Sequence, residues 1–402
     1  MGEFEVHKHQ RNFELACKRV EKDKGVSPEN RKLILSFSRM RIAGGSGRLR
    51  VVKCMYCLRY LAKWLKMPFD KATKEDLIEV VSEIENQPYK ENTKYDFKVV
   101  LKTFYKWMNG NGEEYPPEVK WLKPKLKSNA HKLPEQLITE DEVIRMAQAA
   151  ERPRDRAFLL VLYETGCRIG ELLTLKMKNV QFDEYGAVLR VTGKTGDRRV
   201  RIISSAPTLS AWIDAYTFEK DPEAPLWPPM ATNYKYHGQP MEYRSAHILL
   251  SELAKKAGIN KRIYPHLFRH SRATALAGKL TEAQMKEYFG WTQDSGMAAT
   301  YVHLSGRDVD KALLALQGLV KPEDNHEDRM RVANCLRCRE KNSPIAKFCI
   351  RCGTPMSEGV AAQIDEERKG GDAMLNSLMK NPEFKEFLFK KVTELGLDGQ
   401  LA

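Results

Sequence analysis

The stretch from Lys123 to Gln136 divides this 402-residue chain in two, and it constrains the fold more than any other feature. It holds two prolines and five Lys or His residues among few apolar ones, a composition typical of an interdomain linker. A chain of this length is also too long for one ordinary core. We therefore expect a domain over residues 1–128, a linker at 129–136 and a second domain over 137–322.

The first domain has the apolar spacing of several helices between residues 12 and 108. One helix ends at Pro68, a second begins at Thr73, and a third ends at the turn 109–112, Asn-Gly-Asn-Gly. The first of these helices carries two cysteines one turn apart, which we interpret as buried thiols rather than a redox pair because no βαβ context surrounds them.

The second domain opens with the capping-box sequence Thr139-Glu-Asp-Glu142 and continues as a mostly helical segment to about residue 320. Within it, Gly186–Val191 and Arg199–Ile203 alternate apolar and polar residues around a Gly193–Asp197 turn, which predicts a β-hairpin. The expected fold is mainly α with a small β-sheet, and the second domain is of the α+β class.

Charge points to a polyanionic partner. The net charge is +14, and residues 1–130 carry 27 basic and 17 acidic side chains. A solvated basic surface kept for solubility is the competing interpretation. Lysines at four-residue steps line one helix flank and suit phosphates. The candidates for contacts with a phosphate backbone are Arg48, Arg50, Lys53, Lys94, Lys98 and Lys102, and Lys106 continues the same flank.

Two short motifs carry cations suited to chemistry on a phosphate. Arg168 is expected at an exposed junction between two helices, where its guanidinium can grip two phosphate oxygens and Glu171 can orient it. Lys194 sits on a glycine-flanked hairpin tip and can reach into a neighbouring groove. Taken alone, the first is equally well a surface arginine with a local ion pair, and the second a common Gly-Lys turn.

Two further motifs supply proton-transfer and nucleophilic groups. His266 and Arg269 are three residues apart, so they share one helix face and can address the same phosphate. Tyr301 follows a Phe-Gly-Trp sequence ending at Trp291. A tyrosine is a weak nucleophile at its usual pKa of about 10 and needs nearby cations to stabilise its oxyanion. Either motif alone is more often structural than catalytic.

Taken together and in this order over residues 135–305, the four motifs resemble the catalytic domain of tyrosine recombinases, the phage integrases and Xer-type resolvases. The resemblance includes Thr-Gly-x-Arg-x-x-Glu-Leu, the Gly-Lys hairpin, His-x-x-Arg-His and Tyr-x-His. The preceding helical domain is similar to the family's N-terminal SAM-like domain, which binds core DNA.

The resemblance implies specific roles. Arg168 and Arg269 would hold the non-bridging oxygens of the scissile phosphate, and Lys194 would protonate the leaving 5′-oxygen. His266 would assist proton transfer, and Tyr301 would attack to give a 3′-phosphotyrosine. Supporting positions are Glu171 and His303. The family usually has a histidine, and sometimes a tryptophan, where this chain has Trp291, whose indole N–H can donate a hydrogen bond but cannot shuttle protons.

The resemblance also implies a site-specific recombinase that acts in DNA integration, excision or dimer resolution on double-stranded DNA, with four protomers assembling on DNA. No cofactor is expected for catalysis, since one phosphodiester is exchanged for another and no Walker-type sequence or acidic metal cluster is present. The alternatives are an inactive DNA-binding regulator or architectural protein on the same scaffold, and a type IB topoisomerase-like activity. With neither an apolar run of membrane length nor a signal peptide, we expect a cytoplasmic protein without membrane contact.

The C-terminal part carries a zinc-ribbon signature over residues 330–358. Two Cys-x-x-Cys pairs are separated by ten residues, a spacing that supplies four thiolates for a closed structural Zn²⁺ site. Ribbons of this type resemble those frequent in archaeal proteins. Residues 360–402 are expected to form a helical tail, with an amphipathic helix after Pro382 that packs either on its own chain or on a neighbouring protomer. The predicted zinc ligands are Cys335, Cys338, Cys349 and Cys352.

Overall fold

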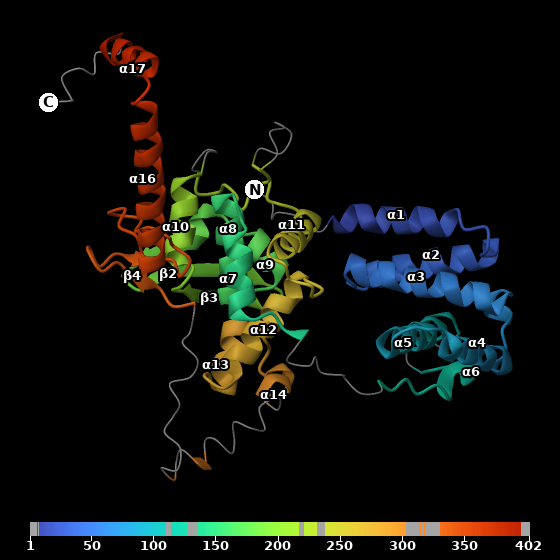
Figure 1. Cartoon of the computed structure of the whole chain (residues 1–402). Coiled ribbons are helices and arrows are strands. Elements are labelled where there is room, and N and C mark those ends of the chain that lie inside the picture. Colours follow the sequence, from blue (N-terminus) through green and yellow to red (C-terminus); the bar gives the residue numbers. More distant parts are fainter. Residues whose placement is uncertain are drawn as a thin grey trace. The chain divides into compact units, whose positions relative to one another are not determined.

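The computed structural model describes residues 6, 8–109, 114–126, 136–216, 221–230, 238–302, 313–314, 317 and 330–394. The chain divides into two compact units, residues 1–133 and 134–402, and each is described by itself (Figure 1). The described residues are mainly helical with small sheets, so the predicted fold class is confirmed.

Unit 1 is a helical bundle built around α3 (Arg48–Leu65), which packs against α1, α2, α4 and α5. Two of its helices begin with N-terminal capping residues. Ser27 caps α2, which has Pro28 in its first turn, and Thr73 forms a full capping box with Asp76 at the start of α4. The other elements are α1 (His9–Glu21), α2 (Pro28–Ala43), a 3₁₀ turn (Phe69–Lys71), α4 (Lys74–Asn86), α5 (Glu91–Met108) and α6 (Pro117–Lys120).

The core of unit 1 is aromatic. Phe37, Phe69 and Phe104 are fully buried and their rings meet edge to face or tilted at 4.9–5.4 Å between centroids. Tyr105 buries its ring in the same layer and donates its hydroxyl hydrogen bond to the Phe69 carbonyl at 2.8 Å. Burial of this area supplies the hydrophobic stabilisation, and the single polar atom in the layer is satisfied. The α3 cysteines, Cys54 and Cys57, are buried and free, as expected.

Unit 2 is centred on α8 (Pro153–Thr165), whose residues from Ala157 to Thr165 are all buried. α7, α10, α12 and β3 pack around it. The surrounding elements are α7 (Glu140–Gln148), α9 (Ile169–Leu173), a 3₁₀ turn (Met177–Asn179), α10 (Ala206–Asp214), α11 (Tyr243–Lys256), α12 (Pro265–Ala277), α13 (Glu282–Phe289) and α14 (Met297–Val302).

A three-stranded antiparallel sheet lies beside α8, in the order β1 (Val180–Asp183), β2 (Gly186–Gly193) and β3 (Gly196–Ile202). The β2–β3 hairpin closes at the pair Gly193–Gly196 and matches the predicted hairpin. β1 was not predicted: its four residues, Val-Gln-Phe-Asp, alternate apolar and polar, but the run is short and the strand is mostly exposed.

Residues 330–356, which we call the ribbon, fold as two loops with a short β4–β5 pairing (Ala333–Asn334 and Lys341–Asn342). The ribbon packs on the rest of unit 2: Lys341 Nζ donates to the Glu184 carbonyl at 2.5 Å, and β5 contacts α10. Two helices follow, α16 (Glu358–Leu378) and α17 (Pro382–Glu394).

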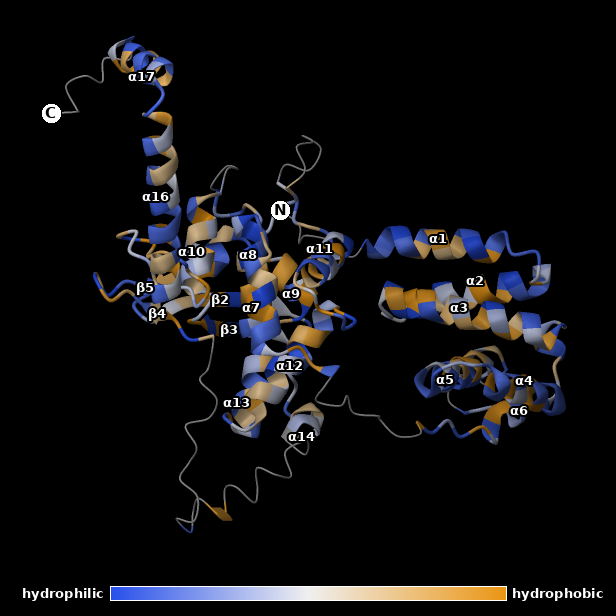
Figure 2. Ribbon diagram, viewed as in Figure 1, coloured by the Kyte–Doolittle hydropathy of each residue, from blue (hydrophilic) through white to orange (hydrophobic). Residues whose placement is uncertain are grey.

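Neither α16 nor α17 buries a residue within the described part of the chain, although both carry hydrophobic positions (Figure 2). The predicted helix after Pro382 is therefore confirmed as a helix, but its packing partner is not. Among the described helices, none has the length and hydropathy of a bilayer span.

Candidate active site

The turn after α13 is the point where the predicted catalytic segments meet. The Phe289 carbonyl accepts a hydrogen bond from Arg269 Nη2 at 2.7 Å. The next carbonyl, that of Gly290, accepts from Arg168 Nη2 at 3.3 Å and from Thr195 Oγ1 at 3.1 Å. Thus α12, the start of α9 and the tip of the β2–β3 hairpin are all tied to two consecutive carbonyls, and the structure brings both arginines together.

The side chain of Tyr301 packs against this turn. The ring of Tyr301 in α14 stacks on Trp291, with centroids 5.6 Å apart and planes 4° apart, and only 5% of the residue is exposed. Its hydroxyl oxygen lies 2.5 Å from His270 Nδ1. Burial raises the pKa of Tyr301, and the positive charge of Arg269 partly offsets that rise. The phenol is therefore held protonated, oriented, and close to a group that can take its proton.

The two arginines bring positive charges close together in a partly buried site. Arg269 is buried and also donates to the Gly166 carbonyl at 2.9 Å, while Arg168 remains about one-third exposed. Burial, together with the nearby charge of Arg168, lowers the pKa of Arg269 to about 10. Two guanidiniums that disfavour each other's charge in a desolvated site would both be stabilised by a shared anion.

Local backbone geometry makes this arrangement possible. Gly166 ends α8 in the left-handed region, at φ +55°, and a Cβ there would lie 2.5 Å from the Phe289 ring. The chain then turns sharply, so that Arg168 becomes the N-cap of α9. This is the helix-to-helix junction that the sequence predicted for Arg168.

Glu171 organises the cations beneath the site. It accepts from Arg168 Nη1 at 2.8 Å and from Arg198 Nη2 at 2.7 Å, and the Glu171 and Arg198 side chains are each 5% exposed. Burial alone would raise the pKa of Glu171, but hydrogen bonds and charges from Arg198 and Arg168 outweigh it and lower the pKa. Glu171 therefore stays ionised and holds the Arg168 guanidinium by a hydrogen bond; its supporting role in catalysis stays a prediction.

Arg198 is a site residue that sequence reasoning missed. From β3 it also donates through Nε to the Tyr288 carbonyl at 3.1 Å and lies 3.5 Å from Cys167 Sγ. A Cβ at Gly290 would lie 2.7 Å from its Nη1, so this guanidinium packs directly under the turn. The available signal was the inward alternation of residues 198, 200 and 202 along β3.

His270 is the second missed residue, although it belongs to the His-x-x-Arg-His motif. It lies one helical turn after His266 on α12, and their rings are 6.4 Å apart. His266 is exposed, whereas His270 is half-buried and touches the tyrosine. Of these two histidines, the one contacting Tyr301 is thus not the one predicted to assist catalysis.

The remaining predicted catalytic residues are less constrained. Lys194 is exposed at the β2–β3 tip, beside the Thr195 that anchors the tip to Gly290. Trp291 presents its ring to Tyr301, and its predicted role as a hydrogen-bond donor stays a prediction. His303 lies outside the described residues.

Most of the candidate phosphate-binding lysines of unit 1 have partners within that unit. Lys98 pairs with Glu85, and Lys94 Nζ donates to the Glu85 carbonyl at 2.8 Å. Lys102 donates to the Leu122 carbonyl at 2.7 Å, and Lys53 pairs with Asp96. These contacts hold helices together and weaken the phosphate interpretation for these four residues.

Arg48 and Arg50 differ from those lysines because both are exposed in the first turn of α3. Lys106 is half-buried, with its amine 5.1 Å from the centre of the Tyr115 ring. Contacts of these residues with DNA stay predictions.

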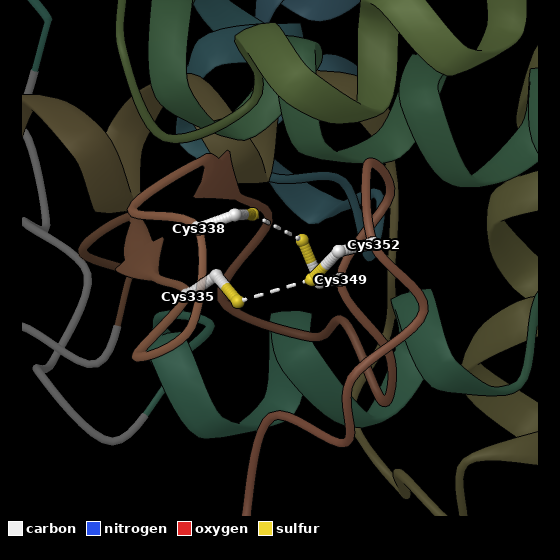
Figure 3. A group of neighbouring side chains, drawn as sticks. All are labelled: Cys335, Cys338, Cys349 and Cys352. Carbon is white, nitrogen blue, oxygen red and sulfur yellow. Dashed lines mark hydrogen bonds between the residues drawn. The ribbon is translucent and has the colours of Figure 1, made fainter.

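The four ribbon cysteines turn their sulfurs toward one another (Figure 3). Sγ of Cys335 lies 3.6 Å from that of Cys352, Sγ of Cys338 lies 3.5 Å from that of Cys349, and all four fall within 4.8 Å of one another. Four sulfurs bound tetrahedrally at about 2.3 Å from a zinc ion lie about 3.8 Å apart. The donor set and its spacing therefore fit such an ion.

Comparison with known proteins identifies the family. The Phage integrase family matches residues 136–307. Tyrosine recombinase XerA of Pyrococcus horikoshii is 31% identical over 217 residues, which covers 54% of this chain and 70% of the relative. Tyrosine recombinase XerC of Staphylococcus epidermidis is 26% identical over 226 residues, covering 53% and 71%.

Solved structures agree on the fold. XerH site-specific recombinase, bound to its palindromic difH substrate, matches with a TM-score of 0.54 at 16% identity over 79% of this chain and 100% of that one. A lambda integrase dimer bound to a COC′ core site matches with a TM-score of 0.54 at 17% identity, over 69% and 77%. The chain therefore belongs to the tyrosine recombinase family and is a site-specific recombinase, an enzyme that breaks and rejoins DNA strands, as the sequence predicted.

Proposed function

We propose that Tyr301 is the nucleophile and that Arg168 and Arg269 hold the scissile phosphate beside it. This proposal rests mainly on one observation: both guanidiniums donate hydrogen bonds to residues 289–290, and the phenol ring stacks on residue 291. Fixed cations in a site with little water stabilise the charge that develops on the pentavalent phosphorus, and they need no reorganisation during the reaction. The depressed pKa of Arg269, about 10, supports this role because a phosphate would supply the missing counter-charge.

The proposed step exchanges one phosphodiester for another. Tyr301 Oη attacks phosphorus, the bond to the 5′-oxygen breaks, and the products are a 3′-phosphotyrosine and a free 5′-hydroxyl. His270, 2.5 Å from the phenol oxygen, takes the tyrosine proton, and Lys194 on the hairpin tip gives a proton to the leaving oxygen. Because bond energy is conserved, the step is nearly thermoneutral, reversible and independent of ATP.

His266 and Trp291 have supporting roles in this scheme. His266 lies on the exposed side of the same helix as Arg269 and would contact the phosphate directly. Trp291 packs flat against Tyr301 and against Phe289, 5.0 Å away, which excludes water from the phenol and fixes its direction of attack.

The substrate we propose is double-stranded DNA carrying specific recombination sites. Unit 1 brings 27 basic side chains within residues 1–130, among which Arg48 and Arg50 are exposed. Recombinases of the same fold have been solved on DNA, including a lambda integrase tetramer bound to a Holliday junction, with a TM-score of 0.52 at 15% identity. We therefore propose that four copies of this chain assemble on two duplexes, in the cytoplasm where such DNA lies.

We further propose that the ribbon holds one structural zinc ion through Cys335, Cys338, Cys349 and Cys352. Four thiolates leave no open coordination position, so the ion stabilises the fold of the ribbon and takes no part in strand cleavage. The Asn342 side-chain amide donates to Cys349 Sγ at 3.6 Å, the kind of contact that orients a metal-bound sulfur.

A suicide substrate tests the proposed chemistry. A duplex with a nick beside the candidate cleavage point loses its short 5′-hydroxyl strand after attack and traps the covalent protein–DNA adduct. We expect a denaturation-resistant adduct with wild type and none with Tyr301→Phe. The matched control is Tyr216→Phe, which removes a buried phenol that donates to the Pro225 carbonyl at 2.9 Å in the same unit, away from the site.

An adduct that persists in Tyr301→Phe would place the nucleophile elsewhere. No adduct with any variant, despite site-specific DNA binding, would support the inactive regulator on this scaffold. Relaxation of supercoiled DNA by monomeric protein without recombination products would support the topoisomerase-like activity.

A further inference from the structure

Positive charge in the C-terminal part of the chain is concentrated in the ribbon. Residues 330–356 contain six basic side chains and one acidic side chain, whereas the rest of residues 321–402 contains eight basic and thirteen acidic ones. Four cysteinates and one Zn²⁺ add two negative charges, so the loaded ribbon still carries a formal charge of +3. A surface kept only for solubility mixes both signs, and here the signs are separated.

The basic side chains of the ribbon are exposed and mostly unneutralised. All six are exposed. The single acidic residue of the ribbon, Glu340, has a carboxylate oxygen 3.7 Å from Arg351 Nη1, and 70% of the Arg351 side chain is exposed to solvent. Lys341 is used to anchor the ribbon on the Glu184 carbonyl. Within the part of the chain that the structure describes, no ion pair is formed by the other four, Arg331, Arg337, Arg339 and Lys347.

The two metal-binding loops present their arginines in equivalent positions. Both have the sequence Cys-apolar-Arg-Cys, so Arg337 and Arg351 are each the third of these four residues. In each loop the residue after the second cysteine is left-handed, Arg339 at φ 60° and Gly353 at φ 70°.

The backbone hydrogen bonds of the two loops match as well. Arg339 N donates to the Cys335 carbonyl at 2.8 Å, and Gly353 N donates to the Cys349 carbonyl at 2.9 Å. The loops are thus related by an approximate repeat. Because the backbone of both turns is already ordered, binding through these arginines would cost side-chain freedom only.

The ribbon is also held against the catalytic unit. The groove between them is lined by Tyr185 of the β1–β2 turn, by Ile203 directly after β3, and on the ribbon side by Arg339, Ile350 and Arg351. The anchoring bond from Lys341 lies at the β1–β2 turn, at the end of β2 opposite to the hairpin tip that carries Lys194. Any phosphate bound by the ribbon therefore lies at a fixed offset from the cleavage site.

We propose that the knuckle arginines Arg337, Arg339 and Arg351 bind the DNA phosphate backbone outside the cleavage site, so that the ribbon extends the DNA footprint of the catalytic unit. The inference rests on the proposed action on duplex DNA and adds a contact to it. Exposed guanidiniums are suited to phosphates, and phosphate contacts position a protein on DNA without reading its sequence. Exposed Leu336, Phe348 and Ile350 lie beside these arginines, so a protein is the competing partner, and the salt dependence of binding separates the two.

The test measures the salt dependence of DNA binding by the full chain, loaded with zinc, in a Tyr301→Phe background that prevents cleavage. The probe is a fluorescent duplex of about 40 base pairs, titrated between 50 and 300 mM KCl. Each phosphate contact contributes about 0.9 to the slope of log K against log salt. We expect the triple variant Arg337→Gln, Arg339→Gln, Arg351→Gln to lower that slope by about 2–3 and to weaken binding at least about tenfold at 150 mM KCl.

The matched control removes the same charge from the acid-rich tail, with Arg368→Gln, Lys369→Gln and Lys380→Gln on and after α16. It is expected to leave the slope unchanged. One zinc per chain and an unaltered unfolding midpoint establish that the knuckle variant is folded. A slope and affinity equal to those of the control overturn the inference and assign the ribbon surface to a protein partner. Adduct formation by the cleavage-competent chain is read separately, so its failure would refute the proposed function without affecting the salt slope.

Discussion

Replacing Glu171 by Gln tests whether the buried ion pair beneath the arginines is essential to unit 2. The pair with Arg198 has an N–O distance of 2.7 Å and both side chains are 5% exposed. Removing one partner of such a pair leaves a buried charge uncompensated and costs about 3–5 kcal/mol. For a unit of this size, about 2–4 °C of melting temperature is lost per kcal/mol, so we expect a fall of about 6–20 °C.

An exposed pair of the same chemistry supplies the control. Arg201 and Asp183 also meet at 2.7 Å, but their side chains are 39% and 35% exposed. Water screens such an exposed pair, so Asp183→Asn should leave the melting temperature close to that of wild type. Differential scanning calorimetry of the full chain measures both variants. Equal shifts in melting temperature for Glu171→Gln and Asp183→Asn would refute the claim that burial makes the Glu171–Arg198 pair important for stability.

The pH dependence of the same variant checks the electrostatic cause. The folded pKa of Glu171 is lowered, because Arg198 and Arg168 outweigh the effect of burial. A carboxyl with a lowered folded pKa contributes stability that is complete above its unfolded pKa, about 4.3, and is lost as pH falls through the folded value. The stability difference between wild type and Glu171→Gln should therefore shrink below about pH 4. A difference that does not change with pH would mean that packing, rather than charge, explains the loss.

Three further outcomes are expected. His270→Gln should slow adduct formation by about 10²–10⁴-fold with DNA affinity retained; an unchanged single-turnover rate would remove His270 from the proton path. Vanadate or sulfate should raise the melting temperature of wild type but not of Arg168→Ala. Equal stabilisation of wild type and of Arg168→Ala by either anion would exclude Arg168 as an anion ligand. Chelation of zinc should expose residues 330–356 to limited proteolysis, since structural zinc supplies most of the folding free energy of so small a module; identical digestion patterns would contradict a metal-held ribbon.

Local signals made the helical junction at Arg168 and the four-cysteine cluster predictable. A glycine that must be left-handed and a fixed Cys-x-x-Cys spacing are properties of short segments, and both act wherever the segment lies in the fold. The capping boxes at Thr73 and Thr139 belong to the same class, and both are present.

Contacts between distant segments were not predictable in the same way. Lys98 looks like one of a row of solvent-facing lysines until α4 brings Glu85 next to it. Arg198 is in phase with Val200 and Ile202 along β3, which indicates an inward position, but only tertiary packing shows that it meets Glu171. His266 and His270 share one helix, and the position of α14 decides which of them meets Tyr301. In each case the partner lies on another element, and its distance is set by tertiary packing.

Mapping the residue that carries DNA in the trapped adduct tests the central claim most directly. After digestion of the protein and of the DNA, mass spectrometry of the wild-type adduct should find a nucleotide attached through a 3′-phosphate to the α14 peptide that contains Tyr301. Attachment to any other residue, or an adduct whose DNA is joined through its 5′-phosphate, would contradict the proposed geometry of attack.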